Sequence, residues 1–424
     1  MRKIISGQPF LYRKNGYHST IIEVIMKDRV RGDYLQMALS LSLQRFPYLS
    51  DKLVEKKGSY YLCEDLNSMT INATKKLRTL GSMQTGYHLL DVTYTGKNIR
   101  VAFHHGLCDG RGIKPFVETL IYYYCTLKYK KQFDTTGIHT VEEKISEKEI
   151  AEPFGTEYYK VDEENIARID KECFSLPENT ENVSNTYRTE IVIDEQEFIN
   201  YAKSNNATPT ILTAILFSKA ILENNDIDKQ IMSNIAIDLR SYLGMEKTHK
   251  NCTGTLFLPF TKEDDEKDLK ELSIEYRDII AKQKDENFIK SNINKQIGLF
   301  KKIDELKTLE EKRKMLSFFD NISNDTFVIS YLGKMQFNDF NQYVDSTHFY
   351  SDGSRGIIIN MVASGDKLSF NILQNFEDSK YVDCFTKILS ERNINFVSRN
   401  VGVFSTGKDK SFITASHQAE RYYK

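Results

Sequence analysis

Two hydrophobic patterns alternate along the chain, and together they predict a mixed α/β protein. Some stretches repeat apolar residues at helical spacing, and others place them at every second position, as a half-buried strand does. Helices are predicted from residue 32 to the Phe46-Pro47 step and over 113–129, 195–204, 208–224 and 378–393. Strands are predicted over 53–64 (as a hairpin), 89–95, 98–105, 187–193, 230–239, 326–332, 354–364 and 367–375. A charged helical block is expected over 264–318, and a frayed tail after residue 393.

The predicted strand 98–105 ends in two adjacent histidines. Its apolar residues occupy alternate positions, and this alternation puts His105 on their face and His104 on the opposite face. A glycine-rich break containing Asp109 and Gly110 follows, and then the next predicted helix begins. The histidines therefore lie where a strand passes through a loop into a helix, a position where loops commonly carry function.

The length of the chain predicts more than one lobe. At 424 residues it exceeds the size at which a single hydrophobic core usually stops growing. A charged and irregular stretch runs from 130 to about 186, and strands and helices occur on both sides of it. We therefore expect two layered α/β lobes, residues 1–180 with the histidine pair and residues 181–424.

Composition and charge exclude several classes of function. The 58 basic and 59 acidic side chains give a formal net charge of −1, which argues against nucleic acid as the main partner. No apolar run reaches the roughly 20 residues needed to cross a bilayer, and the first residues lack the apolar core of a signal peptide. The six cysteines are scattered without a Cys-x-x-Cys pair, which indicates reduced thiols and a cytoplasmic protein.

The histidine pair admits four chemical interpretations. A metal site is disfavoured, because neighbours on a strand point to opposite faces and no third histidine lies at ligand spacing. Cys108 is a candidate nucleophile beside His105, although cysteines are commonly just buried. Both histidines can also be satisfied by hydrogen bonds within a core. Finally, an imidazole near its reference pKa of about 6.5 suits general-base catalysis, with Asp109 locking the loop.

The pattern His-His-x-x-x-Asp-Gly, formed by His104, His105, Asp109 and Gly110, resembles the signature of the chloramphenicol-acetyltransferase-like superfamily. This superfamily includes nonribosomal peptide condensation domains, plant-type acyltransferases and alcohol O-acetyltransferases. The first predicted helix is similar to theirs in ending with Arg-Phe-Pro, and the stretch 234–244 is similar to their strand with a single arginine. The resemblance therefore spans most of the chain.

The resemblance implies a fold and a role for each matched residue. The fold would be two similar lobes in a V around a central channel, with the motif at its centre. His105 would be the general base, whereas His104 and Asp109 would be structural and Gly110 would give a tight turn. Arg240, from the second lobe, would pair with Asp109; the alternative is an ordinary surface or inter-strand ion pair.

The implied reaction is an acyl transfer. A coenzyme A thioester would be the donor and a small-molecule alcohol or amine the acceptor, in a monomer with no metal and no permanently bound cofactor. One alternative is condensation or esterification that depends on a separate carrier protein bearing the acyl group as a phosphopantetheine thioester. Another is a non-catalytic binding protein of the same fold.

The sequence also departs from the plant-type branch of that superfamily. It has no Asp-Phe-Gly-Trp-Gly stretch and no tryptophan, and the nearest equivalent is 329–335, with Gly333 after a predicted strand. The residues that would hold pantetheine thus stay unassigned. The turn 352–356 offers Arg355 as a ligand for a phosphate of coenzyme A, but a plain hairpin turn explains this segment more simply.

Overall fold

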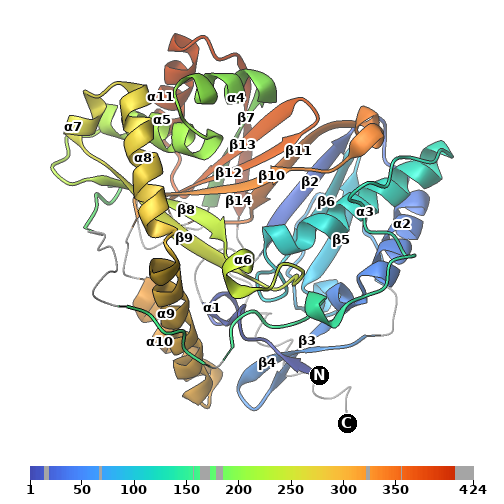
Figure 1. Cartoon of the computed structure of the whole chain (residues 1–424). Coiled ribbons are helices and arrows are strands. Elements are labelled where there is room, and N and C mark those ends of the chain that lie inside the picture. The colour runs from blue at the N-terminus through green and yellow to red at the C-terminus, as the bar shows by residue number, and fades with distance from the viewer. Residues whose placement is uncertain are drawn as a thin grey trace.

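The chain folds into two lobes, each a β-sheet with helices packed on one face (Figure 1). The computed structural model describes residues 1–13, 19–65, 69–155, 157–162, 172–177, 185–320, 325–354 and 356–405. Strands and helices occur in both lobes, so the predicted mixed α/β fold is confirmed.

The first lobe contains a four-stranded antiparallel sheet. In spatial order its strands are β11 (Val344–Ser351), β2 (Thr20–Met26), β6 (Asn98–Phe103) and β5 (Leu90–Thr95). Two helices, α2 (Gly32–Arg45) and α3 (Gly110–Tyr129), pack on one face of this sheet. Apolar residues at alternate strand positions, such as Ile22 and Val101, join the helical residue Leu120 in one core.

The second lobe contains a seven-stranded mixed sheet. In spatial order its strands are β14 (Phe396–Ser405), β7 (Asn185–Asp194), β13 (Lys367–Gln374), β12 (Ile357–Ser364), β10 (Phe327–Lys334), β8 (Ile231–Asp238) and β9 (Thr253–Phe260). Its helices are α4 (Glu195–Ser204), α5 (Pro209–Glu223), α8 (Leu269–Gln283) and α11 (Lys380–Glu391). Ile359 and Met361 lie in the core beneath these helices, whereas Val362 belongs to the core of the first lobe. The other face of this sheet therefore turns toward the first lobe.

Shorter elements connect and flank the two sheets. A small sheet contains β1 (Arg2–Lys3), β4 (Ser59–Cys63) and β3 (Lys52–Lys56). The remaining helices are α1 (Gln8–Leu11), α6 (Arg240–Leu243), α7 (Lys262–Asp265), α9 (Glu286–Glu305) and α10 (Leu309–Asp320). Between 130 and 184, the part of the chain that the structure describes holds one short 3-10 turn at 147–149 and otherwise irregular backbone, in line with the predicted linker.

The predicted helices and strands are all present within a few residues of their expected bounds. Strands β1, β2, β9, β11 and β14 were not predicted, and the expectation of a frayed tail is wrong for 396–405, which pairs with β7. The sequence TIIEVIM of β2 lacks alternation because nearly all of its residues are buried. Strand β11, with the sequence VDSTHFYS, is mostly polar although it is buried, so its periodicity is also lost.

Strand β11 connects the two lobes. It follows β10 of the second sheet along the chain, yet it pairs with β2 at the edge of the first sheet, with His348 opposite Glu23. The division into 1–180 and 181–424 stays a prediction, and this strand crosses it. The C-terminal half of the chain thus supplies an edge strand to the sheet of the first lobe.

A buried ionic cluster lies between the two sheets. Glu23 of β2 accepts hydrogen bonds from Arg100 Nε at 2.8 Å and from the Tyr350 hydroxyl at 3.0 Å. Arg188 of β7 places its guanidinium carbon 3.6 Å from the centroid of the Tyr350 ring and its Nη2 2.5 Å from Glu190 Oε1. Burial alone would raise the pKa of Glu23, but the charges of Arg100 and Arg188 lower it overall. The charges of the cluster thus compensate one another inside the interface.

We expect Arg188→Met to destabilise the protein strongly. The substitution keeps much of the side-chain volume but leaves Glu190 and Glu23 short of one buried positive charge. Removing one partner of a buried ion pair typically costs about 3–5 kcal/mol, which urea denaturation would measure. As a control, Lys229→Met removes an exposed ion pair with Glu172 and should leave the urea midpoint unchanged. A loss below about 1 kcal/mol for Arg188→Met, the range of surface pairs, would contradict the cluster's role.

Candidate active site

The two histidines lie in the loop that joins β6 to α3. Strand pairing ends at Phe103, so the predicted strand is two residues too long, and alternation along a strand does not separate the two side chains. The backbone N–H of His104 donates to the Leu89 carbonyl at 3.0 Å, and its Nδ1 accepts from the Gly106 N–H at 2.8 Å. A ring nitrogen that accepts is unprotonated, so His104 is neutral. It is 2% exposed and stabilises the loop from within.

His105 differs from His104 in being partly exposed. Its ring lies against Phe10 of α1, with a centroid distance of 4.5 Å and an interplanar angle of 31°, and meets Phe103 edge-on at 5.9 Å. Burial lowers the pKa of His105 to about 4, although the Asp109 charge and a backbone hydrogen bond with Cys108 oppose this shift. The imidazole is therefore uncharged at neutral pH and can accept a proton.

Asp109 is the N-cap of α3 and one of the contacts between the lobes. Its Oδ1 accepts from the Gly112 N–H at 2.7 Å, which satisfies a free backbone donor of the first helical turn. The same oxygen lies 2.7 Å from Arg240 Nη2, and Oδ2 accepts from the backbone N–H of Cys252 at 2.8 Å. Both carboxylate oxygens are thus occupied, one of them by two donors.

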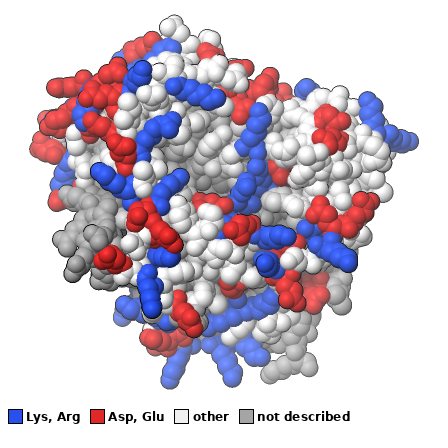
Figure 2. Space-filling model, in the orientation of Figure 1, with Lys and Arg blue, Asp and Glu red and all other residues white. Residues whose placement is uncertain are grey.

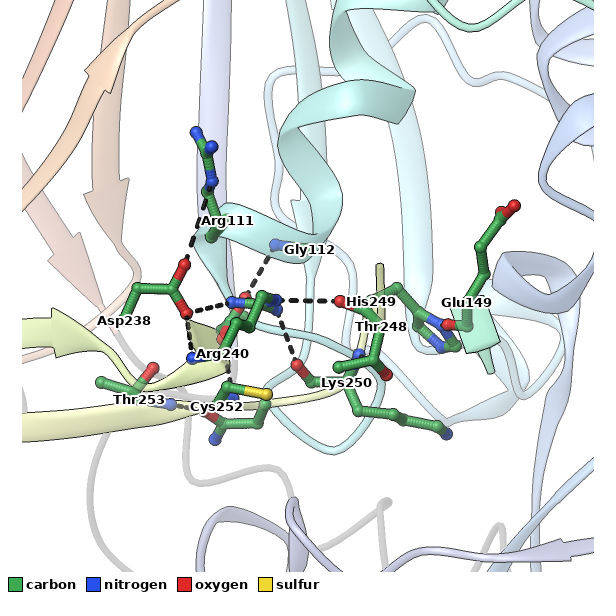
Figure 3. Close-up of polar contacts among 12 residues, drawn as sticks. Arg111, Gly112, Glu149, Asp238, Arg240, Thr248, His249, Lys250, Cys252 and Thr253 are labelled. Atoms are coloured by element: carbon green, nitrogen blue, oxygen red, sulfur yellow. Dashed lines mark hydrogen bonds and ion pairs between the residues drawn. The ribbon is translucent and has the colours of Figure 1, made fainter. Parts of the chain in front are cut away.

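Arg240, at the start of α6, completes this contact from the second lobe (Figure 3). Its Nε donates to the Thr248 carbonyl at 2.9 Å, its Nη2 to the Lys250 carbonyl at 2.8 Å, and its Nη1 to Asp238 Oδ1 at 2.8 Å. The residue is 5% exposed; burial would lower its pKa, but the charge of Asp109 raises it. The arginine is held by several partners and is more than a surface ion pair.

Two glycines allow the helix to approach the second lobe. A Cβ added to Gly112 would lie 2.0 Å from the His249 carbonyl oxygen, and one added to Gly110 would lie 3.0 Å from Leu332 Cδ1. Neither glycine has a positive φ, so the requirement is space rather than an unusual backbone conformation. The sequence assigned the structural role to Gly110, but Gly112 is the position where a side chain fits least.

A further set of residues, which was not predicted from the sequence, holds the loop 248–252 in place. The backbone N–H and Nδ1 of His249 both donate to the Glu149 carbonyl, at 2.9 and 2.5 Å, and its ring stacks on Tyr48 at 4.4 Å. The Glu149 carboxylate binds both terminal nitrogens of Arg45, the arginine of the Arg-Phe-Pro stretch. Lys250 is 2% exposed with Nζ 3.7 Å from Glu152. Nothing in the sequence marks Lys250 as a buried residue. Arg45, in contrast, stands in the Arg-Phe-Pro stretch, and this stretch could have pointed to the residues that hold the loop.

The structure also bears on Cys108 as a nucleophile, on a metal site and on Arg355 as a phosphate ligand. Burial raises the pKa of the Cys108 thiol well above its ordinary value, so this residue is a poor thiolate nucleophile. Among the described residues, no group of three or more His, Cys, Asp or Glu side chains is arranged to hold a metal ion. Arg355 lies outside the described residues.

One face of the molecule is hollowed. Figure 2 shows a depression between α8 and α3 whose visible floor is formed by neutral residues, while basic and acidic side chains lie around its border. Charges of both signs are interspersed on this face. Within the described residues, every helix is too short or too polar to cross a membrane.

We expect Asp109→Ala to destabilise the protein more than the loss of a helix cap explains. The substitution removes the cap of α3 and leaves Arg240 buried without its carboxylate, at a typical cost of about 3–5 kcal/mol. Asp194→Ala is the matched control, because Asp194 caps α4 through Glu197 N–H at 2.8 Å and is exposed. Loss of such a cap costs about 1 kcal/mol. Equal losses in urea denaturation of the two variants would contradict the interlobe role of Asp109.

Comparison with known proteins places the fold. No family model and no curated protein matches the sequence. Among solved structures, TRI101 of F. sporotrichioides complexed with coenzyme A and T-2 is 12% identical, with a TM-score of 0.61 over 95% of this chain and 99% of that chain. Polyketide synthase associated protein 5 of Mycobacterium tuberculosis is 13% identical (TM-score 0.56; 92% and 97% covered). The first condensation domain of the CDA synthetase is 12% identical (TM-score 0.57; 92% and 95% covered). The chain therefore has the fold that these three structures share.

Proposed function

We propose that the protein is an acyltransferase that moves an acyl group from a coenzyme A thioester to an alcohol or amine, with His105 as general base. The observation that carries the proposal is an uncharged, partly exposed imidazole in a loop fixed by Asp109 and Arg240. A general base must be unprotonated and held in one orientation. TRI101, which has this fold, was solved with coenzyme A and T-2, and this supports a thioester donor and a small-molecule acceptor.

The reaction follows from proton transfer at His105. The imidazole takes the proton of the acceptor hydroxyl or amine as its oxygen or nitrogen attacks the thioester carbonyl carbon. The new bond converts the carbonyl oxygen into an oxyanion, which backbone N–H groups near Gly110 or hydroxyl groups of the second lobe would stabilise. When the intermediate collapses, the carbon–sulfur bond breaks, and the leaving thiolate receives the proton from the imidazolium. His105 returns to its uncharged form, and no permanently bound cofactor is needed.

The other residues of the motif act in this proposal through the geometry of the loop. His104 holds the turn through its bond from the Gly106 N–H, and Asp109 ties α3 to the second lobe. The Asp109 charge also favours the imidazolium that forms during proton transfer, because it raises the pKa of His105 against the effect of burial.

Carrier-dependent condensation is the second candidate function. Its support is the likeness to the first condensation domain of the CDA synthetase. In that case a separate carrier protein would present the acyl group as a phosphopantetheine thioester, and free acyl-coenzyme A would be a poor donor. A non-catalytic binding protein would hold a donor or acceptor tightly without turnover.

Thiol release from acetyl-coenzyme A, with a panel of alcohols and amines, tests the proposal. We expect His105→Ala to lower kcat/KM by about 10²–10⁴-fold, the usual contribution of a general base, with little change in Tm. His139→Ala is the control, because His139 is exposed and pairs with Glu143. Undiminished turnover in His105→Ala would exclude it as the base. Activity restricted to a loaded carrier protein would favour condensation, and tight donor binding without turnover would favour a binding protein.

The proposal also predicts how activity depends on pH. A general base works only when it is unprotonated, and burial lowers the pKa of His105 to about 4. We therefore expect kcat/KM to stay constant from neutral pH down to about pH 5 and to fall below that as His105 gains a proton. A profile that already falls near pH 6.5 would show that burial does not lower the pKa of His105.

A further inference from the structure

The N-terminal segment lies directly on the motif loop. A Cβ added to Gly7 would lie 2.5 Å from Gly106 Cα and 2.7 Å from the His105 carbonyl oxygen. One added to Gly106 would lie 2.8 Å from Leu11 Cγ. Neither glycine has a positive φ, so both serve the close approach of two backbones. The contact brings α1 against the loop at the residue that carries the proposed base.

Helix α1 contributes an aromatic ring at this contact. The Phe10 ring is tilted by only 31° from the His105 ring at a centroid distance of 4.5 Å, within the range of attractive aromatic pairs. Phe103 meets the same imidazole edge-on, at 5.9 Å and 76°. Phe10 and His105 are both partly exposed, whereas Phe103 is fully buried. The imidazole is therefore held between two rings, and Phe10 is the ring that also reaches the surface.

We propose that the segment Ile4–Tyr12 forms one wall of the reaction centre, and that Phe10 is a positioning residue that orients the His105 ring and excludes water from it. This inference rests on the proposed function and extends it to a residue outside the motif. Phe10 would also contact the part of the acceptor or thioester nearest the base, so this part is expected to be apolar.

Contacts of other residues anchor the backbone of the segment. The backbone N–H groups of Ile5 and Ser6 donate to the Glu152 carboxylate, at 3.4 and 3.1 Å. Gln8 Nε2 donates to Asp304 of α9 at 3.0 Å, and β1 pairs with β4. These contacts fix the backbone of the wall, so truncating the Phe10 side chain is expected to leave the wall in place.

Among the described residues, the elements that pack against His105 carry few charged groups. Helix α1 contains no charged residue, and the only charged residue of β6, Arg100, is bonded to Glu23. Within the loop, Asp109 favours the protonated ring and Cys108 contributes a backbone hydrogen bond. Burial outweighs both, and it depends on what covers the ring. Removing Phe10 therefore changes the dominant influence on His105 and leaves the charges unchanged.

Titration of His105 by NMR tests the inference, with the resonance assigned by its absence in His105→Ala. We expect a pKa of about 4 in the wild type, a clear upward shift toward 6.5 in Phe10→Ala, and a return toward the wild-type value in Phe10→Tyr, which keeps the ring. Phe376→Ala is the control, because it removes a ring packed on Tyr381 in the second lobe. It should leave the titration of His105 unchanged.

Turnover supplies the second measurement. For Phe10→Ala we expect the acid limb of kcat/KM to move upward with the pKa, and kcat at neutral pH to fall about tenfold to a hundredfold, as misplaced groups do. The inference would be overturned if Phe10→Ala lowered only the Tm. In that case the pKa of His105 and the acid limb of kcat/KM would both stay at their wild-type values. If the wild type shows no turnover with any donor, the proposed acyl transfer fails, while the NMR titration still decides whether Phe10 controls His105.

Discussion

The buried pair of Asp109 and Arg240 is the constraint on which the arrangement of the two lobes around the motif depends. Taking two charges out of water is costly, and the cost is offset only when every remaining donor and acceptor is satisfied. Here the carboxylate also binds Gly112 and Cys252, and the guanidinium also binds the carbonyls of Thr248 and Lys250. The pair is stable only if α3 and the loop 248–252 lie in one relative position. The start of α3, and with it the loop before that helix, is thereby fixed.

The two neighbouring histidines have different surroundings in this fixed loop. His104 is inside the turn, with Nδ1 bonded to a backbone N–H, and His105 is at its edge between two phenylalanine rings. Strand alternation predicted that they would diverge, and they do, but the cause is the turn after Phe103. The two side chains therefore diverge for a reason other than the strand pattern from which the divergence was predicted.

The elements that the sequence predicted best are those whose local signals, such as an apolar stripe, determine the structure without help from distant residues. Helices α3 and α5 were predictable from their apolar stripes, and α5 also from its cap, although α3 begins at Gly110, three residues before the predicted start. Strand β11 was not predictable, since its polar residues are buried by partners that only the fold provides. Likewise, Phe10 precedes the motif by more than 90 positions, and Lys250 is a charged residue in an interior. Such contacts depend on three-dimensional neighbours that no local period encodes.

The path of β11 has a consequence for how the protein is made. Its pairing with β2 joins residues roughly 320 positions apart, and non-local pairing of this kind slows folding. During synthesis at about 5–20 residues per second, β2 emerges long before β11 and would wait tens of seconds with one edge unpaired. An exposed strand edge is a template for aggregation. The first lobe is thus a late product of translation, although it begins at the N-terminus, and a gene fragment that ends before residue 344 would encode an incomplete sheet.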